Sequence, residues 1–265
     1  MEIIKDYVIN KKKEFAKIAK DLKLSIAIIQ VGHVPASDRY VKNKIKDCEE
    51  TGITCKLIAL PETISEAKLL KIIKKLNRDK KVTGFIVQLP LPKTISEEKV
   101  KLAISPEKDI DGFHPLNNKV AAATPAGIMM YLEDQKFDFS GKNAVILGRS
   151  NIVGKPMHKL LLDKNMNVTI LHSYTTEEDK RFYLEHADLI IVATGCRNTI
   201  TPDYKLKQTA VLMDVGINVD SNNKLHGDVE QELPIAFKSP VPSGCGLLTR
   251  LALLLNSIKL YKNKK

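Results

Sequence analysis

Apolar, β-branched runs alternate with amphipathic stretches along the whole chain, in two successive sets. The first set has strand-like runs at 24–32, 55–61 and 83–90, separated by helical patterns at about 37–51 and 63–78. The second set has strand-like runs at 143–148, 167–173, 187–195 and 210–218, with helical patterns at about 152–164 and 177–186. Continuous apolar runs joined by helices are typical of parallel sheets that are covered on both faces. The pattern therefore predicts an α/β protein with two βα domains.

A stretch rich in proline, glycine and asparagine, "SPEKDIDGFHPLNNKVAAATPAG", separates the two sets and indicates a domain junction. The apolar segment 246–262 predicts a terminal helix that packs back on the first domain. We expect one domain from 1–118 together with 247–265, and a second from 119–246. Ligands usually bind at the carboxyl ends of parallel strands, so we expect a cleft between the domains to hold the site.

Composition narrows the class of protein. The chain has 265 residues, of which 43% are hydrophobic, which is enough for two small cores. No run of about 18 apolar residues predicts a membrane span, and the first residues lack the apolar region of a secretory signal. The four cysteines form no CxxC pair and the histidines show no zinc-ligand spacing. We expect a cytoplasmic protein with reduced thiols and no metal site.

The net charge of +11 raises the question of a nucleic-acid partner. The lysines are spread over amphipathic helices and the tail "KLYKNKK", and the aromatic residues, 5% of the chain, do not interleave with the basic runs. We therefore do not expect nucleic-acid binding. A positive field also suits a small acidic substrate.

A glycine turn in the second set predicts a phosphate site. "VILGRSNIVGKPMHKLLL" joins a strand to a helix through Gly148 and Gly154, and such a turn offers backbone N–H groups and a helix N-terminus to a phosphate. A Walker A loop is disfavoured, because five residues separate the glycines and Pro156 stands where a hydroxyl should bind Mg²⁺. A tight turn without a ligand stays open as the alternative.

The end of the next strand indicates which dinucleotide would bind. In NAD-specific folds a carboxylate near this position binds the ribose 2′-hydroxyl, but here the chain is "LHSYTT". Arg149 and Ser173 could instead receive a 2′-phosphate, since arginine offers a fixed fork of donors. The pattern favours a Rossmann-type domain that binds NADP.

In the first set, the segment "SDRYVKNKIKDC" contains the lysine with the most unusual predicted environment. We place Ser37 near the N-cap of a helix. Tyr40 and Lys44 then lie four residues apart at the edge of the apolar face, whereas Lys42 and Lys46 project to the far side with Arg39. Lys44 is therefore predicted to be partly buried, which would lower its pKa and suit it to acid–base work. A lysine whose stem lines a core boundary is the alternative.

Two further polar residues follow apolar runs. Gln88 closes the strand in "IVQLPLP", where it could be an active-site hydrogen-bonding group or a residue that anchors a loop. Asp111 in "DIDGFHP" precedes a glycine, and on its own that pattern favours a turn residue over a functional carboxylate.

Taken together, the motifs raise a specific resemblance. The segments "PASDRYVKNKIKDCEETGI", "GFIVQLPLPK", "SPEKDIDGFHP", "TPAGI", "GRSNIVGKP", "DVGIN" and "GDV" occur in one order. This ordered set resembles the bifunctional methylenetetrahydrofolate dehydrogenase/methenyltetrahydrofolate cyclohydrolase family over roughly residues 24–255.

The resemblance implies an enzyme of one-carbon metabolism, with a role in purine biosynthesis, that is usually a homodimer. It implies NADP-dependent oxidation of 5,10-methylenetetrahydrofolate to 5,10-methenyltetrahydrofolate, followed by hydrolysis to 10-formyltetrahydrofolate. The first domain would then bind folate and the second would bind NADP.

The resemblance also assigns roles by position. The catalytic group comprises Lys44, Tyr40, Gln88 and Asp111, of which Tyr40 would pack on the folate ring and Asp111 would bind the pterin edge. The residues implied to contact NADP are Gly148, Arg149, Ser150, Ile152, Ser173, Gly216 and Ile217. Gly246 and Leu247 would adjoin the folate pocket, where this chain reads "PVPSGCGLLT" and the family usually reads close to "PVPGGVGPMT".

Two other functions stay open on the sequence. One is a dehydrogenase without hydrolase activity, since the 117–124 loop is shorter than in the family and Leu247 replaces a proline. The other is a basic binding protein on an α/β framework, which would bind nucleic acid in a salt-dependent way.

Overall fold

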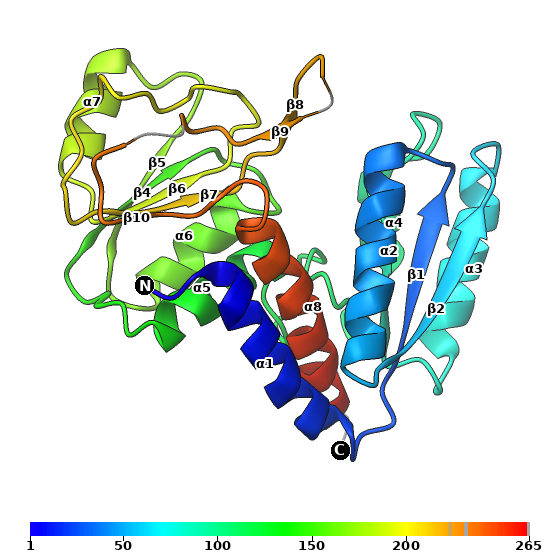
Figure 1. Cartoon of the computed structure of the whole chain (residues 1–265). Coiled ribbons are helices and arrows are strands. Elements are labelled where there is room, and N and C mark those ends of the chain that lie inside the picture. Colours follow the sequence, from blue (N-terminus) through cyan, green and yellow to red (C-terminus); the bar gives the residue numbers. More distant parts are fainter. Residues whose placement is uncertain (223, 231–232, 264–265) are drawn as a thin grey trace. The chain divides into compact units, whose positions relative to one another are not determined.

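A computed structural model describes residues 1–222, 224–230 and 233–263 of the chain. Its contacts divide the chain into two compact units, one of residues 1–8 and 124–249 and the other of residues 9–123 and 250–265 (Figure 1). We call them the five-stranded unit and the three-stranded unit after their sheets. Two helices, α1 (Ile4–Ala19) and α8 (Cys245–Lys262), contain residues of both units.

The division differs from the sequence expectation chiefly at the N-terminus, where residues 1–8 belong with the second set of strands. Their contacts explain this. The Tyr7 hydroxyl donates a hydrogen bond to Asp134 (2.7 Å), and the rings of Tyr7 and Tyr131 meet edge to face with centroids 5.0 Å apart. The other divisions fall at 123/124 and 249/250, near the expected 118/119 and 246/247.

The three-stranded unit contains a parallel sheet in the order β2-β1-β3. Its elements are β1 (Ser25–Val31), α2 (Pro35–Glu50), β2 (Thr54–Leu60), α3 (Glu66–Arg78), β3 (Gly84–Val87) and α4 (Glu97–Ala103), together with the larger part of α1 and α8.

Alternate residues of β1 supply two different cores in this unit. Ala27, Ile29 and Val31 pack with α3 and α4, and Ile26 and Ile28 face the opposite side, where α2 and the part of α8 from Arg250 onward lie. All five side chains are at most 5% exposed. This burial on both faces explains why β1 reads as a continuous apolar run and not as an alternating one.

The five-stranded unit contains a parallel sheet in the order β10-β7-β6-β4-β5 (Figure 1). Its elements are α5 (Ala123–Asp134), β4 (Asn143–Leu147), α6 (Gly154–Leu162), β5 (Asn167–Leu171), α7 (Glu177–Glu185), β6 (Leu189–Val192), β7 (Val211–Asp214), the short antiparallel pair β8 (Asn218–Val219) and β9 (Leu225–His226), and β10 (Phe237–Lys238).

The strand order locates the usual ligand position in this sheet. From β4 the chain goes first to β5 on one side and then to β6 on the other, so the order reverses at β4. In doubly wound sheets ligands bind outside the carboxyl ends of the strands at such a switch point. The loops that follow β4 and β6 therefore frame the candidate dinucleotide site.

The predicted α/β class with two βα arrays is confirmed. Among the residues that the structure describes, no helix is long and apolar enough to cross a membrane, and no cluster of histidine, cysteine, aspartate or glutamate could hold a metal ion.

Candidate active site

Lys44 is buried in the three-stranded unit, with 7% of its surface exposed. It lies on the face of α2 that also buries Val41 and Cys48, whereas Arg39, Lys42 and Lys46 are exposed, as the helical spacing predicts. Its ammonium nitrogen donates a hydrogen bond to Gln88 Oε1 (3.0 Å) and lies 4.8 Å from the centre of the Tyr40 ring.

The expectation that Ser37 caps this helix is wrong. The helix begins two residues earlier, at Pro35, whose fixed φ suits the first helical position, and the N-cap is Val34 with no side-chain cap. Ser37 is instead buried in the first turn, where its hydroxyl donates to Leu89 O (3.4 Å). It thereby links α2 to the segment that carries Gln88.

Gln88 immediately follows β3, and its side-chain amide has a defined orientation. Its backbone N–H continues the ladder to Ile29 O (2.8 Å), and its Nε2 donates to Leu89 O (2.7 Å). Because the NH₂ group is engaged there, the amide oxygen is the atom that faces Lys44. Lys44 thus has a neutral acceptor that fixes its position without taking its proton.

Asp111 belongs to a loop that the neighbouring Asp109 holds in place. The Asp109 carboxylate accepts hydrogen bonds from the backbone N–H groups of Gly112 (3.0 Å) and His114 (2.8 Å). Gly112 has φ +70°, and a Cβ there would lie 2.5 Å from Ala121 O, so the tight loop requires glycine at this position. A pocket beside the loop is lined by both aspartates, Phe113 and His114.

Burial and charge give Lys44 and Asp111 unusual protonation equilibria. Burial lowers the pKa of Lys44, an effect that the negative charge of Asp111 opposes and the positive charge of Arg250 reinforces. Burial also raises the pKa of Asp111 to about 6, with Lys44 acting in the opposite direction. A lysine amine that is neutral at lower pH than usual can accept and return a proton.

In the five-stranded unit, the turn after β4 has no room for side chains at its two glycines. Gly148 has φ +112°, and a Cβ on it would lie 2.3 Å from Ala193 O, at the end of β6. A Cβ on Gly154 would lie 2.1 Å from Gly148 O. The Ser150 hydroxyl accepts from Val153 N (3.1 Å) and so closes the turn at the start of α6. Such a turn lets a ligand approach the backbone closely.

Arg149 is exposed beside the turn that follows β5. Its guanidinium carbon lies 5.5 Å from the centre of the Tyr174 ring, and Ser173 is the exposed residue just before that tyrosine. Adjacent strands thus bring the arginine and the serine-containing turn together, which is the arrangement expected for a phosphate held by both. Ile152 is half-buried in the turn between them and α6.

Two buried aspartates that the sequence reasoning missed hold the loops at the ends of β6 and β7. Asp228 is fully buried and accepts hydrogen bonds from Thr194 N (2.7 Å), Gly195 N (2.9 Å) and Asn218 Nδ2 (2.9 Å). Asp214 is the second of the pair. The only sequence signal was their place in "DVGIN" and "GDV".

The second carboxylate holds the segment that contains Gly216. Asp214 Oδ1 accepts from Gly216 N and from Asp228 N, both at 3.0 Å, and burial raises its pKa. A Cβ on Gly216 would lie 2.0 Å from Asp228, so this glycine is required by the close approach of the carboxylate. The next residue, Ile217, is 61% exposed.

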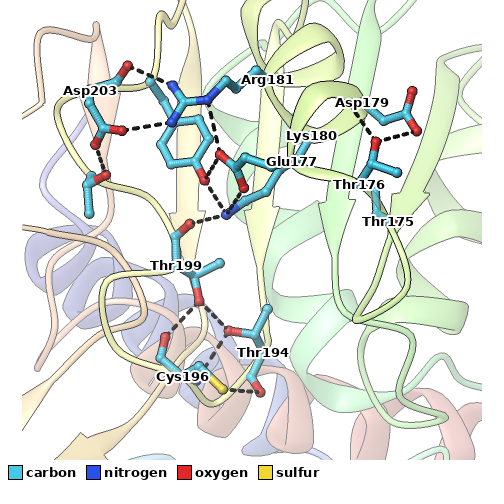
Figure 2. Close-up of polar contacts among 12 residues, drawn as sticks. Thr175, Thr176, Glu177, Asp179, Lys180, Arg181, Thr194, Cys196, Thr199 and Asp203 are labelled. Atoms are coloured by element: carbon cyan, nitrogen blue, oxygen red, sulfur yellow. Dashed lines mark hydrogen bonds and ion pairs between the residues drawn. The ribbon is translucent and has the colours of Figure 1, made fainter.

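The loop after β6 is also tied to α7. Figure 2 shows Lys180 Nζ donating to Thr199 O (2.8 Å) and the hydroxyls of Thr194 and Thr199 in contact (2.8 Å). Thr199 Oγ1 donates in turn to Cys196 O (2.8 Å). Because Thr194 is bound to Asp228 as well, this loop is anchored from both sides.

Gly246 and Leu247 lie in the first turn of α8, within the five-stranded unit. Both are half-buried, and Leu247 N donates to Gly244 O (2.9 Å).

Comparison with known proteins matches both halves of the chain to one family. Residues 2–111 match the model of the tetrahydrofolate dehydrogenase/cyclohydrolase catalytic domain, and residues 122–265 match that of the corresponding NAD(P)-binding domain. The chain is 44% identical over 270 residues to a bifunctional protein FolD of Listeria innocua, covering 98% of this chain and 93% of that protein.

Solved structures of enzymes from the same family have the same fold as this chain. A bifunctional FolD enzyme from Campylobacter jejuni superposes with a TM-score of 0.94 at 38% identity, with both chains covered completely. A Trypanosoma brucei methylenetetrahydrofolate dehydrogenase-cyclohydrolase, solved with NADP cofactor and inhibitor, superposes with a TM-score of 0.90 at 25% identity, covering 100% of this chain and 97% of that one.

Proposed function

Because the chain belongs to the tetrahydrofolate dehydrogenase/cyclohydrolase family, we propose that Lys44 transfers the protons of its hydrolytic step and that the turn 148–154 binds its cofactor, NADP. The chain is a bifunctional enzyme. It oxidises 5,10-methylenetetrahydrofolate to 5,10-methenyltetrahydrofolate with NADP, and it hydrolyses that product to 10-formyltetrahydrofolate. The three-stranded unit binds the folate in this proposal, and the five-stranded unit binds NADP.

One observation carries the assignment of Lys44. Its buried amine is fixed by Gln88 at 3.0 Å and lies beside Asp111 and Tyr40. In the hydrolysis, the neutral amine takes a proton from the attacking water, and the resulting ammonium returns a proton to the folate nitrogen that leaves the former methenyl carbon. The second proton of the water goes to solvent as the formyl C=O bond forms. Gln88 keeps the amine aimed through both transfers, because its oxygen accepts from either protonation state.

Tyr40 and Asp111 orient the substrate. The Tyr40 ring offers a flat apolar surface for the folate ring system. The Asp111 carboxylate accepts hydrogen bonds from the N–H groups on the pterin edge, which requires its ionised form. Gly246 and Leu247 are the further substrate-binding positions that the family resemblance implies, with leucine in place of the proline that is usual in the family.

The residues of the five-stranded unit fit a dinucleotide. The glycine turn, with no room for a Cβ at Gly148 or Gly154, presents backbone N–H groups and the start of α6 to the pyrophosphate, and Ser150 and Ile152 line that turn. Arg149 and Ser173 hold the 2′-phosphate. Gly216 and Ile217 lie at the nicotinamide end. NADP, when bound, supplies the hydride acceptor, and these residues contribute to catalysis by orientation.

We further propose that the chain works as a homodimer in the cytoplasm and supplies one-carbon units for purine biosynthesis, on the strength of the family resemblance. Sedimentation velocity tests the oligomeric state: a dimer mass at micromolar protein supports it, and a monomer at all concentrations contradicts it.

Assaying the two half-reactions separately tests the role of Lys44. We expect Lys44→Met to reduce hydrolysis of methenyltetrahydrofolate to the rate in buffer while the binding of NADPH, followed by nucleotide fluorescence, is unchanged. The surface variant Lys42→Met is the matched control from the same helix. Hydrolysis at the wild-type rate in Lys44→Met would remove the proposed role, whereas a chain that oxidises but never hydrolyses its substrate would be a dehydrogenase only.

A further inference from the structure

A group of buried charges lies one helical turn after Lys44 on α2. Asp47, one helical turn after Lys44, is 2% exposed. Its carboxylate binds two cations that come from distant parts of the chain: Arg250 of α8, with Nε 2.9 Å from Oδ2, and Lys12 of α1, with Nζ 2.5 Å from Oδ1. Lys12 also contacts Glu50 at 2.6 Å. The side chain of Arg250 is only 12% exposed.

Arg250 and Lys44 face the same enclosed space within the three-stranded unit. The space is otherwise lined by isoleucine and leucine side chains of β1, β3, α8 and Ile110, and by Cys48. Charges that share an apolar, poorly hydrated region interact much more strongly than charges in water. Each of two cations so placed disfavours the charged form of the other. Arg250 is the one that keeps its charge, because a guanidinium is not deprotonated in proteins.

We propose that Arg250 is a positioning residue for the hydrolytic step: held by Asp47, its guanidinium keeps the Lys44 amine in the neutral form that accepts a proton from water. The inference rests on the proposed role of Lys44. It adds an arginine that lies 206 positions after Lys44 in the sequence and forms an ion pair with Asp47. The motif around Lys44 contains Asp47 but not this arginine.

The other groups around Lys44 make this balance sensitive to Arg250. From the loop after Ile110, Asp111 favours the charged amine, as do Cys48 on α2 and Cys55 on β2, whereas β1 contributes only apolar side chains and Gln88 is uncharged. Burial is the largest cause that lowers the pKa of Lys44, and Arg250 is the charged group that acts in the same direction. Without Arg250, Lys44 would lose the positive charge that opposes the effect of Asp111, and Asp47 would keep Lys12 as its partner.

Two substitutions separate this role from a purely structural one, because they should move the pH dependence in opposite directions. Arg250→Gln keeps a polar side chain beside Asp47 but removes the charge, so the acidic limb of the methenyltetrahydrofolate hydrolysis profile should move to higher pH, by about one unit. Asp47→Asn leaves the charge of Arg250 unopposed, so the same limb should move to lower pH. Arg250→Lys should keep the limb near its wild-type position.

The pH of half-maximal hydrolysis is the deciding measurement, with thermal unfolding recorded for each variant. If hydrolysis becomes slower at every pH in both variants and the acidic limb does not move, the inference is overturned, because a loss of packing alone would have that effect. Equal shifts in Arg250→Lys and Arg250→Gln would overturn it too. Lys44→Met distinguishes a failure of this inference from a failure of the proposed function. If Lys44→Met still hydrolyses at the wild-type rate, the proposed function is wrong. If Lys44→Met is inactive but the limb of Arg250→Gln does not move, only the role of Arg250 is wrong.

Discussion

Asp111 is held in a position that disfavours its own charge. Burial raises its pKa to about 6 from 3.8, so ionising it at neutral pH costs free energy of folding. The carboxylate that binds substrate in our proposal is therefore a source of instability in the free enzyme, as is common at functional sites.

Replacing this carboxylate should accordingly stabilise the protein. We expect Asp111→Asn to raise the free energy of unfolding at neutral pH by about 1 kcal/mol, allowing for the water that reaches this partly exposed group. The gain should be complete above pH of about 6 and should vanish as the pH falls to 3.8, where the wild-type carboxyl is protonated in both states. Urea unfolding at several pH values measures it. An equal or lower stability of the variant at neutral pH would contradict the prediction, and folate binding should be weakened in either case.

Arg149 should decide the choice between the two nicotinamide dinucleotides. Because its guanidinium is exposed beside Ser173 and no carboxylate occupies that turn, Arg149→Ala should weaken NADP binding by about tenfold or more and change NAD binding little. Fluorescence titration with the two reduced nucleotides gives both affinities. Arg78→Ala, which changes an exposed arginine at the end of α3 in the other unit, is the control. Equal losses for NADP and NAD would place Arg149 away from the 2′-phosphate.

Helical spacing was sufficient to predict which lysine is buried, because Lys44 follows Tyr40 by four residues on the edge of an apolar face. The same reasoning could not find Arg250 or Asp228. Both act through contacts across long sequence separations, Arg250 with Asp47 and Asp228 with Thr194, and neither has a local pattern that marks it. The prediction that Ser37 caps the helix failed for a local reason, because the helix already begins at Pro35.

At the scale of elements, the loops at the ends of β6 and β7 depend on one carboxylate. We expect Asp228→Asn to reduce kcat/KM for the NADP-dependent oxidation by at least about tenfold, because Thr194, Gly195 and Asn218 lose part of a shared acceptor. Hydrolysis of methenyltetrahydrofolate should be retained, since Lys44, Gln88 and Asp111 lie in the other unit.

The two activities thus provide an internal control for that variant. Asp203→Asn is a matched substitution of an exposed carboxylate in the same unit, where Asp203 contacts Arg181 at the surface (Figure 2), and it should leave both activities within about twofold. Loss of both activities in Asp228→Asn would indicate general unfolding and contradict a role limited to the cofactor side.

The long buried elements were predictable and the short ones were not. Strands β1 and β4 carry enough consecutive apolar residues to be recognised, and α3 has a clear apolar stripe, with Leu69, Ile73 and Leu76 buried. Helix α4 has seven residues, and β8, β9 and β10 have two each, so no periodicity can develop in them. Their positions follow from tertiary contacts such as the pairing of β10 with β7.

At the scale of the whole molecule, each unit is assembled from separate stretches of the chain. The three-stranded unit requires the part of α8 from Arg250 onward, which buries Leu251, Leu253 and Leu254 and donates from Asn256 Nδ2 to Ile110 O (2.9 Å). The asparagine bond fixes the segment that leads into Asp111.

Removing the chain after Thr249 should therefore disable one unit selectively. We expect that truncation to abolish hydrolysis, because the core around Lys44 loses its α8 side, while the five-stranded unit keeps measurable NADP binding. Nucleotide fluorescence and the hydrolysis assay together measure the outcome, and removal of only the last four residues is the control. Retained hydrolysis in the truncated chain would show that α8 is dispensable for the site.

The same arrangement has a consequence for biosynthesis. The ribosome makes Lys44, Gln88 and Asp111 long before Arg250 and the leucines that close the core around Lys44. Until that part of α8 has left the exit tunnel, the nascent three-stranded unit exposes an apolar face of β1 and leaves Asp47 without its arginine. During that interval the growing chain carries an apolar face that can aggregate, although its catalytic lysine is already made.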